Sequence, residues 1–425
     1  DAPPSGKRVL VIGAGPSGLS AAYHLTRLGH AVTIREAGPM AGGMMRFGIP
    51  KFRLPRDVLD VEIDRIIGMG ITLELNTRVE DIDAAFDAEG FDAVFVAVGA
   101  HLARRTEIPA HAAGRILDAV SLLRDVELGA TPPQLGRRVI VYGGGNTAMD
   151  VARTAKRLGV DEAMIVYRRS RDEMPAHDFE AREAEEEGVL IHWLRTIKQI
   201  DESAFTVEKM RIDAEGRPQP TGEFETLEAD TLVLALGQDV DAAFLDAVPG
   251  VQIAGDGVVE VDSQMMTGRA GLFAGGDMVP SERTVTVAIG HGKKAARNVD
   301  AWLRGGQYEK APKAELASFE NLNTWYYDDA PKRVQDQLSM VRRQSGFEEV
   351  EKGLTEDNAL FEARRCLSCG NCFECDNCYG ICPDNAVIKL GPGNRFSIDL
   401  DYCKGCGICA TECPCGAIKM VPEIA

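Results

Sequence analysis

The cysteines are the side chains with the clearest capacity for chemistry in this sequence, and they are gathered at one end. All 11 cysteines of the 425 residues lie between Cys366 and Cys415. An odd number cannot pair completely within one chain, so a disulfide framework would leave a thiol over. Thiolates also bind metals, and this crowding favours metal ligation in a reducing compartment over a disulfide scaffold. We therefore expect a cytoplasmic protein with a metal centre in its C-terminal part.

Eight of the cysteines form two units of identical spacing, CxxCxxCxxxC, each followed by proline. The first unit runs from Cys372 to Cys382 and the second from Cys403 to Cys413. This doubled spacing is that of bacterial ferredoxins with two [4Fe–4S] clusters, in which the fourth cysteine of each unit binds the other cluster. Zinc also accepts CxxC pairs, but the doubled run with prolines favours iron. The expected ligands are Cys372, Cys375, Cys378 and Cys413 for one cluster, and Cys403, Cys406, Cys409 and Cys382 for the other.

Three cysteines remain outside these units, namely Cys366, Cys369 and Cys415. Three thiolates are one short of the four that a further cubane cluster requires. We interpret them as spare thiols. A register in which Cys366 and Cys369 serve the first cluster stays open.

A glycine-rich turn follows the first apolar segment of the chain. The apolar residues 9–12 lead into Gly13-Ala14-Gly15-Pro16-Ser17-Gly18, a helical pattern follows, and the next apolar segment ends at Glu36. In this context Gly13 permits a tight turn, Gly15 lets the backbone approach a pyrophosphate, and Gly18 lets helix and strand pack closely. The helix N-terminus then faces the phosphates, and the Glu36 carboxylate can accept hydrogen bonds from ribose hydroxyls. We predict a dinucleotide site here.

The same pattern returns later in the chain as a GxGxxA variant. It consists of Gly143, Gly145 and Ala148, and the apolar segment after the helical pattern ends in Arg168-Arg169 instead of an acid. Guanidinium groups at this point suit a 2′-phosphate, which favours NADP over NAD. The alternative is a solvated basic pair on a loop. We therefore leave the nicotinamide cofactor as NAD(P).

A third segment completes the first dinucleotide-binding domain. An apolar stretch reaches Gly275-Gly276-Asp277, and a helical pattern begins near Thr284. The Asp277 carboxylate can bond a ribityl hydroxyl, and a helix N-terminus can favour charge on a flavin ring. The strand ends at 95–99 and 232–238 occupy matching positions in the two halves, where we expect them to pass close to a cofactor. The flavin domain is thus split, with the nicotinamide domain inserted into it.

Taken together, these motifs resemble the glutamate synthase small-subunit family of two-dinucleotide flavoproteins. The resemblance covers roughly residues 5–305 and is carried by "GGMMRFGIPKFRLPRDV" (42–58), "GGGNTAMD", "VYRRS" and "GGD". The residues that it implies for FAD are Glu36, Gly43, Met44, Arg53, Asp277 and Thr284. The residues that it implies for NAD(P)H are Asn146, Thr147, Ala148, Arg168, Arg169, Gly237 and Gln238.

The placement of the cysteines departs from that family. Because the flavin motif begins at residue 7, we expect the N-terminal iron–sulfur domain of that family to be absent here, with the sulfur at the C-terminus instead. The whole layout is similar to the FAD subunits of 2-oxoacid dehydrogenase complexes of the phenylglyoxylate dehydrogenase type. That similarity implies NAD, in conflict with the two arginines, so NAD(P) remains the expectation.

The elements that must position these residues define an α/β fold. We expect two Rossmann-like dinucleotide-binding domains, with the NAD(P) domain inserted into the FAD domain, and a small C-terminal α+β domain like a bacterial ferredoxin. The expected segments are 1–130 and 241–305 for the FAD domain, 131–240 for the NAD(P) domain, 306–365 for a linker with helices and 366–425 for the ferredoxin-like domain.

Two features of the joint between flavoprotein and ferredoxin lead to specific expectations. The stretch 323–331 groups three aromatic residues before Pro331, and we interpret it as an anchor packed on the flavoprotein, with a contact to a partner protein as the alternative. Thr355 precedes a helical pattern that leads into the cysteines, and we expect its side chain to cap that helix.

The net charge, and the types of residue that the sequence lacks, exclude several classes of function. The net charge of −18 disfavours nucleic acid as a partner, and no apolar run of about 18 residues predicts a membrane span. A thioredoxin-reductase-like reaction needs a dithiol beside the flavin, and no cysteine precedes Cys366. No serine–histidine–acid set or catalytic carboxylate pair stands out, so we expect no catalytic side chains.

Electron transfer is the function that these sites have in common. Nicotinamide exchanges electrons in pairs as hydride, [4Fe–4S] clusters carry them singly, and a flavin can do both. We expect an FAD-dependent NAD(P) oxidoreductase subunit that serves a complex with other subunits, including a ferredoxin-type carrier, while the organic substrate lies on another subunit. The alternatives are a glutamate-synthase-type NADPH reductase subunit, or a scaffold subunit whose flavin does not turn over.

Overall fold

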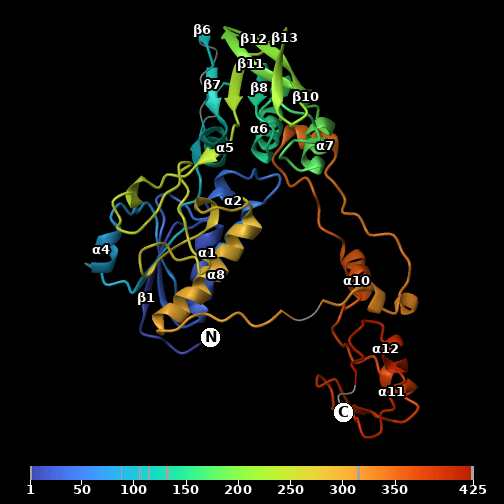
Figure 1. Cartoon of the computed structure of the whole chain (residues 1–425). Coiled ribbons are helices and arrows are strands. Elements are labelled where there is room, and N and C mark those ends of the chain that lie inside the picture. Colours follow the sequence, from blue (N-terminus) through green and yellow to red (C-terminus); the bar gives the residue numbers. More distant parts are fainter. Residues whose placement is uncertain are drawn as a thin grey trace. The chain divides into compact units, whose positions relative to one another are not determined.

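The chain folds into two compact units, each built from two separate stretches of sequence (Figure 1). The structure is a computed structural model, and it describes residues 2–87, 89–104, 106, 108–112, 115–130, 134–313 and 316–422. Unit 1 comprises Asp1–Tyr308 and Leu338–Val350, and unit 2 comprises Glu309–Gln337 and Glu351–Ala425. Within the described residues, no helix is both long and apolar enough to cross a membrane.

A parallel sheet forms the first half of unit 1, with the strand order β16-β4-β1-β2-β3. Its central strands are apolar and buried on both faces, as parallel sheets covered by helices require. The strands are β1 (Arg8–Ile12), β2 (Ala31–Arg35), β3 (Thr72–Glu74), β4 (Ala93–Val96) and β16 (Leu272–Ala274).

Helices α1 (Pro16–Arg27) and α8 (Val285–Leu303) pack side by side against this sheet, although they come from distant parts of the sequence (Figure 1). The approach is close at Gly292, where a Cβ would collide with the backbone of α1 at Ser17. The third sequence segment thus contributes strand β16 and helix α8 to the first sheet and its covering layer. The remaining elements of this half are α2 (Met44–Phe47), α3 (Arg56–Ile67), α4 (Ile82–Asp87), β5 (Leu102–Ala103), β15 (Gln238–Asp239), η1 (Ala243–Leu245) and η2 (Gly276–Met278).

A second parallel sheet, in the order β10-β9-β8-β14-β7, forms the other half of unit 1. Its elements are β7 (Arg115–Asp118), α5 (Ala119–Glu127), β8 (Arg138–Tyr142), α6 (Asn146–Arg157), β9 (Glu162–Tyr167), α7 (Asp178–Glu186), β10 (Leu190–Trp193) and β14 (Thr231–Leu234). Strand β7 precedes residue 131, where we expected this domain to begin, yet it pairs with β14. The second sheet thus starts earlier in the chain than the sequence pattern indicated.

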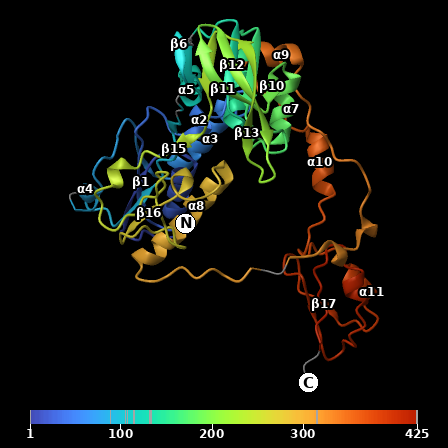
Figure 2. The same ribbon diagram turned by 45° about the horizontal axis from the view of Figure 1, so that its top comes forward.

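A third sheet covers one face of the second (Figure 2). Its strands are β6 (Ala110–Ala112), β11 (Arg195–Asp201), β12 (Ala204–Ile212) and β13 (Pro218–Glu228). Strands β11, β12 and β13 form an antiparallel meander, and β6 pairs in parallel with β11. Phe205 and Val207 of the meander bury their side chains against Ile140 and Leu232 of the second sheet.

Residues 338–350 return to unit 1 after the chain has entered unit 2. They contain the short helix α9 (Met340–Ser345). The backbone amide of Leu338 donates to the carbonyl oxygen of Val350 at 2.8 Å, so the two ends of the segment meet. We expected this stretch to belong to a linker, but it packs as part of the flavoprotein.

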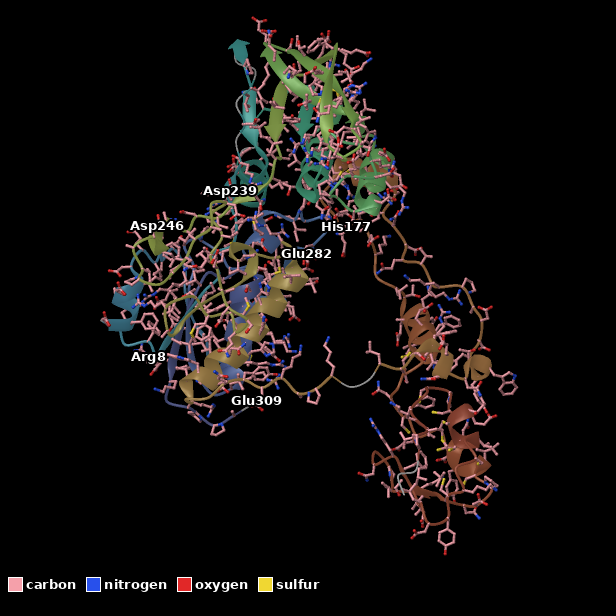
Figure 3. All side chains as sticks on the ribbon, in the orientation of Figure 1. Arg8, His177, Asp239, Asp246, Glu282 and Glu309 are labelled. Carbon is pink, nitrogen blue, oxygen red and sulfur yellow. The ribbon has the colours of Figure 1, made fainter. Side chains whose placement is uncertain are left out.

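Unit 2 holds all 11 cysteines, most of them on the loops between short elements (Figure 3 shows the sulfur atoms in yellow). These elements are η3 (Phe319–Asn321), η4 (Thr324–Tyr326), α10 (Glu356–Arg364), α11 (Asn377–Ile381), β17 (Val387–Lys389), β18 (Phe396–Ile398) and α12 (Ile408–Thr411). Strands β17 and β18 pair antiparallel, and α11 contacts α12. The expected cap of α10 is confirmed, because the Thr355 hydroxyl oxygen accepts from the Asn358 amide at 3.3 Å.

The aromatic stretch 323–331 corrects one expectation. It was expected to anchor on the flavoprotein, but it lies in unit 2 and bonds to the cysteine-bearing chain. The Tyr326 hydroxyl donates to the Glu412 carboxylate at 2.7 Å, and the Tyr327 hydroxyl donates to the carbonyl oxygen of Leu367 at 3.2 Å. The stretch is therefore an anchor for the ferredoxin-like unit.

Candidate functional site

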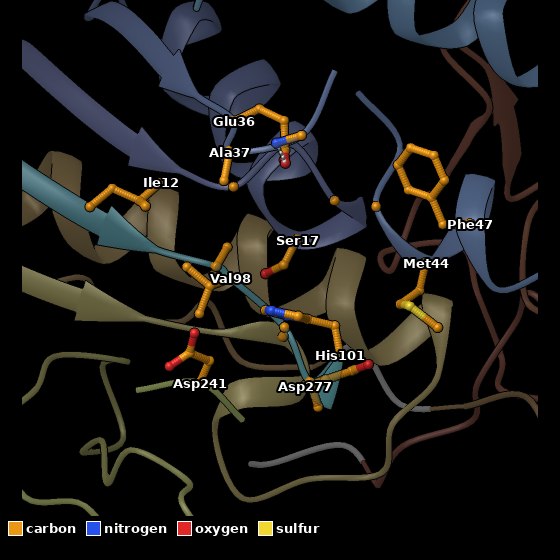
Figure 4. A pocket seen from close by; sticks show the side chains of 18 of the residues that line it. Ile12, Ser17, Glu36, Ala37, Met44, Phe47, Val98, His101, Asp241 and Asp277 are labelled. Atoms are coloured by element: carbon orange, nitrogen blue, oxygen red, sulfur yellow. Dashed lines mark hydrogen bonds between the residues drawn. The ribbon is translucent and has the colours of Figure 1, made fainter. Parts of the chain in front are cut away.

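A cavity of about 440 Å³ opens at the carboxyl ends of the first sheet (Figure 4). This is where ligands bind in open α/β sheets. Of the residues that we expected to hold FAD or to form its glycine turn, the cavity is lined by Gly13, Gly15, Glu36, Gly43, Met44 and Asp277. In the view of Figure 4, Glu36 lies above the cavity and Asp277 lies below it. Met44 lies at the right.

Close backbone packing explains the glycines of the first turn. Gly13 has φ +102°, and a Cβ there would collide with the carbonyl oxygen of Ala97. A Cβ on Gly18 would collide with the carbonyl oxygen of Gly13. Gly43 has φ +52°, and its Cβ would stand 2.8 Å from the Cα of Gly15, so this second loop lies directly against the turn. The turn is therefore shaped by its neighbours as well as by the ligand that it would face.

The carboxylate of Glu36 is oriented by the turn itself. One oxygen accepts from the Ala14 amide at 2.8 Å, and the other accepts from the Gly38 amide at 2.7 Å. Glu36 follows the last residue of β2, so the end of that strand delivers the acid to the cavity. An ionised carboxylate has further lone pairs, which leaves acceptor capacity for ribose hydroxyls.

Asp277 lies on the other side of the cavity, just after β16. Burial raises the pKa of its carboxyl group above the ordinary value, and the charge of Arg283 partly opposes that shift. The cavity is also lined by His101, Ser121 and Arg124, which the sequence reasoning missed. His101 follows the strand end at 95–99, so that expected cofactor-facing segment was the available signal.

Two of the residues implied for FAD lie outside this cavity lining. The Arg53 guanidinium donates from one nitrogen to both carboxylate oxygens of Asp150 at 2.8 Å, and from the other to Glu180. These partners belong to α6 and α7 of the second half. The Thr284 hydroxyl accepts from the Val287 amide at 3.2 Å and so caps α8. In this structure Arg53 therefore joins the two halves of unit 1, and Thr284 stabilises the start of α8.

The second glycine turn repeats the first in backbone detail. Gly143 has φ +149°, and a Cβ there would collide with the carbonyl oxygen of Ala235, as a Cβ on Gly13 would with that of Ala97. The two turns also share a backbone hydrogen bond. The Ala235 amide donates to the carbonyl oxygen of Tyr142 at 2.9 Å, and the Ala97 amide donates to that of Ile12 at 2.8 Å. The two strand ends that we expected beside a cofactor, at 95–99 and 232–238, thus do face the two turns.

The residues expected to bind NAD(P)H lie around this second turn and beyond β14. Gly145 is the N-cap of α6, Asn146 and Thr147 begin that helix, and Ala148 is buried within it. A Cβ on Gly145 would meet nothing within 4 Å, so the helix N-terminus is open there. Anions bind at such helix ends because the first amides lack partners.

The second group of expected nicotinamide residues consists of two arginines and a strand end. Arg168 follows β9 and is exposed, and Arg169 beside it lies 3.6 Å from the Glu173 carboxylate. Gly237 has φ +104° and accepts from the Arg104 amide at 3.0 Å. Gln238 pairs with Ala103 in the short ladder of β15 and β5.

Cys378 lies near three other cysteines of the two units. Burial and the charges of Cys372, Cys375 and Cys413 raise the pKa of the Cys378 thiol to about 11. A bound metal would reverse this, because a coordinated thiol is deprotonated outright. These four cysteines are the set expected for one cluster.

The second group contains Cys409, whose thiol pKa is raised by burial and by the charges of Cys403 and Cys406. The turn that begins at Cys382 approaches this group, because the Asp399 amide donates to Ala386 at 2.8 Å and the Lys404 ammonium lies 3.2 Å from Asp384. Backbone amides already point at two of the expected ligand sulfurs: Ala386 donates to Cys382 Sγ and Ala417 to Cys413 Sγ, both at 3.3 Å. Such donors stabilise a thiolate, so the residues present fit a cluster.

Across the part of the chain that the structure describes, no group of three or more His, Cys, Asp or Glu side chains is arranged to hold a single metal ion. A [4Fe–4S] cluster differs from a single metal ion in this requirement, because each of its four thiolate ligands binds a different iron. Of the spare cysteines, Cys366 and Cys369 are exposed, while Cys415 is buried with its Sγ 3.7 Å from that of Cys413.

The fold and these sites define an oxidoreductase that carries FAD, NAD(P) and [4Fe–4S] clusters. Residues 7–292 match the family model of pyridine nucleotide-disulphide oxidoreductases, and residues 396–419 match that of 4Fe-4S binding domains. The chain belongs to the pyridine nucleotide-disulphide oxidoreductase family.

Curated relatives agree with this assignment. The chain is 40% identical over 395 residues to the NADP(+)-dependent formate dehydrogenase subunit beta of Moorella thermoacetica, covering 86% of this chain and 55% of that one. It is 36% identical to the NADPH-Fe(3+) oxidoreductase subunit beta of Geobacter sulfurreducens, covering 86% and 62%. It therefore spans less than two thirds of either relative. A putative glutamate synthase [NADPH] small chain of Cereibacter sphaeroides is 34% identical over 69% of this chain and 76% of that one.

Solved structures share the fold of unit 1. A thioredoxin reductase of T. acidophilum superposes with a TM-score of 0.55 at 20% identity, covering 69% of this chain and 97% of that one. FprA, an oxidoreductase of Mycobacterium tuberculosis, gives 0.60 at 17% identity, covering 73% and 88%. The fold is shared, but the matched residues 7–292 contain no cysteine, so they hold no dithiol of their own.

Proposed function

We propose that this chain is an electron-transfer subunit that passes electrons between NAD(P) and ferredoxin-type clusters through FAD. One observation carries the proposal: a single chain holds two dinucleotide-type glycine turns and a doubled cysteine unit. When bound, the flavin supplies exchange between electron pairs and single electrons. The side chains of this protein then bind and orient, and no acid, base or nucleophile is required.

Each part of the chain has a definite task in this proposal. Glu36 and Asp277 would bind the ribose and ribityl hydroxyls of FAD from opposite sides of the cavity. The open N-terminus of α6 would bind the phosphates of NAD(P)H. The eight cysteines of the two units would hold the clusters, with the amides of Ala386 and Ala417 stabilising the sulfurs of Cys382 and Cys413.

We assign NADPH as the preferred nicotinamide. Two arginines follow β9, where the 2′-phosphate of NADPH would lie, and Arg168 is exposed to receive it. The names of the relatives from Moorella thermoacetica, Geobacter sulfurreducens and Cereibacter sphaeroides all specify NADP(+) or NADPH. These observations outweigh the similarity to the NADH-linked phenylglyoxylate dehydrogenase type.

Steady-state dye reduction by the isolated chain tests this proposal. Wild type should reduce an artificial acceptor with NADPH in preference to NADH. Arg168→Ala and Arg169→Ala should each lower kcat/KM for NADPH by roughly tenfold, because a charged hydrogen bond is worth about 1.5–3 kcal/mol. The value for NADH should change much less.

The control and the contrary results are equally specific. Arg171→Ala removes an exposed arginine nearby that pairs with Asp178 and Glu185, and it should leave the preference intact. A wild type that prefers NADH, with both variants leaving that preference unmoved, would contradict the assignment. No reduction with either nucleotide would instead support the alternative of a scaffold subunit.

For the organic substrate we propose a separate subunit. The layout of FAD domain, NAD(P) domain and C-terminal cysteines supports a 2-oxoacid oxidoreductase of the phenylglyoxylate dehydrogenase type. A second candidate is a formate dehydrogenase, favoured by the 40% identity to the Moorella thermoacetica subunit. A glutamate-synthase-type complex is the third. Purifying the complex and asking whether phenylglyoxylate, formate or glutamate reduces its clusters distinguishes the three.

A further inference from the structure

The segment 338–350 forms a closed strap on unit 1. It leaves and re-enters unit 2 at its two ends, where Leu338 and Val350 are buried and joined by a backbone hydrogen bond of 2.8 Å. A segment that served only as a linker would be expected to have exposed end residues, whereas Leu338 and Val350 are buried. The burial shows that the strap is held in place by the flavoprotein.

The strap contacts both halves of unit 1. On the side of the first sheet, the Val350 amide donates to the carbonyl oxygen of Phe52 at 2.9 Å. The ring of Phe347 lies 6.4 Å from that of Phe52. On the side of the second sheet, the Gln344 amide nitrogen donates to the carbonyl oxygen of Glu187 at 2.9 Å, directly after α7. The strap thus bridges the two dinucleotide-binding halves.

Phe52 is the point at which the two halves interlock. Its side chain is completely buried, and its ring is covered by the guanidinium groups of Arg157 at 3.7 Å and Arg153 at 4.9 Å. Both arginines belong to α6, and both are paired with the buried carboxylate of Glu187. Arg53, the next residue, is paired with Asp150 of α6 and Glu180 of α7.

The same short stretch also reaches the flavin-side cavity. Gly43 and Met44 line that cavity, and Phe52 and Arg53 lie only a few residues further along. One continuous stretch of chain, which begins with α2, therefore connects the cavity wall to α6 and α7, and the strap contacts the far end of this stretch at Phe52. A change in how the strap packs would be transmitted to the relation between the two halves.

We propose that the strap 338–350 acts with Phe52 and Arg53 as a lock that sets the orientation of the nicotinamide-binding half toward the flavin cavity. Phe347 and Gln344 are then positioning residues for hydride exchange between NAD(P)H and FAD. The inference rests on that exchange, which requires the reacting atoms to be about 3–3.5 Å apart. A small misorientation of the two halves slows the reaction even when both cofactors are bound.

Stopped-flow flavin bleaching of the full chain with NADPH tests the lock. Phe347→Ala should lower the rate constant at saturating NADPH by at least about tenfold, since a misplacement of about 1 Å can cost about 100-fold. FAD content, iron content and the NADPH concentration giving half-maximal rate should stay unchanged. Phe347→Leu, which keeps apolar volume, should recover most of the rate. Val341→Ala, in helix α9 of the same strap, removes a side chain that is 78% exposed, and it should behave as wild type.

Amide hydrogen exchange of the FAD-loaded protein supplies a second readout. Phe347→Ala should exchange faster at residues 50–54 and 183–187, whereas Val341→Ala should not. If Phe347→Ala does not fold, Gln344→Leu removes a single hydrogen bond and should slow bleaching in the same direction.

Two results would overturn the lock. The first is a folded Phe347→Ala or Gln344→Leu variant that bleaches at the wild-type rate. The second is a Phe347→Ala variant that slows the reaction only by raising the half-saturating NADPH concentration. A wild type that NAD(P)H does not bleach would instead contradict the proposed function, so the two failures are distinguishable.

Discussion

At the scale of single residues, one buried carboxyl carries a pH signature. Burial raises the pKa of Asp150 to about 6, although its partner Arg53 opposes the shift. Glu180, which shares Arg53, raises the pKa further, and Arg153 lowers it. A carboxyl group whose folded pKa is raised binds protons more tightly in the folded state, so its contribution to stability is present at low pH and is lost as pH rises through 6.

We predict that this signature disappears in Asp150→Asn. The free energy of unfolding of wild type minus that of the variant should fall between about pH 4 and pH 6 and stay level above it. Chemical unfolding across that pH range measures the difference. A difference that rises with pH would mean that the pairing with Arg53 dominates and that the pKa is lowered instead.

Residue roles were predictable from the sequence where backbone geometry alone dictates them. Gly13 and Gly143 sit where a Cβ would strike a carbonyl oxygen, and this requirement is visible as a motif. Arg53 shows the opposite case. Its partners lie almost a hundred residues or more along the chain, so neither its spacing nor its family resemblance indicated that it bonds Asp150 and Glu180.

At the scale of elements, the sequence predicted features that depend on neighbouring residues, but it did not predict contacts between distant segments. The cap of α10 at Thr355 needs only its own three following residues, and that prediction is confirmed. The aromatic stretch 323–331 was correctly expected to anchor, but on the wrong unit. The hydroxyls of Tyr326 and Tyr327 hold the stretch on unit 2, while Trp325 stays 84% exposed, and these non-local partners are not visible in the aromatic composition.

The Thr355 cap leads to a prediction about α10. Thr355→Ala should destabilise the start of this helix by about 1 kcal/mol, because the Asn358 amide loses its acceptor. Amide exchange at residues 356–359 should quicken accordingly. Ser339→Ala is the matched control, since Ser339 precedes α9 without a side-chain capping bond. Equal effects of the two substitutions would show that the Thr355 bond contributes nothing to helix stability.

At the scale of the whole molecule, the sequence indicated the order of the parts better than their limits. Repeated glycine turns and repeated cysteine units predicted the dinucleotide-binding fold and the ferredoxin-like unit. The start of the second sheet at β7 and the return of residues 338–350 were not predictable, because neither segment carries a repeated motif. Both are defined by pairing and packing partners far away in the sequence.

Cofactor content is the first prediction at this scale. We expect about one FAD and about eight irons per chain, because eight cysteines in two units supply four ligands to each of two cubanes. Iron and flavin analysis of anaerobically purified protein measures this. About twelve irons would indicate a further cluster that recruits Cys366 and Cys369, and zinc in place of iron would contradict the ferredoxin-like assignment.

The central claim is that electrons pass from the nicotinamide through the flavin to the clusters, and Cys403→Ala tests it most directly. The variant lacks an expected ligand of one cluster, while every residue of the flavin cavity lies within the first 288 residues. Its assembly and its iron and FAD contents must be verified first, because cluster binding also supplies folding energy. In rapid mixing with NADPH, flavin bleaching should proceed at the wild-type rate, and reduction of a ferredoxin-type acceptor should collapse. An assembled variant that lacks this cluster yet reduces the acceptor at the wild-type rate would contradict the account.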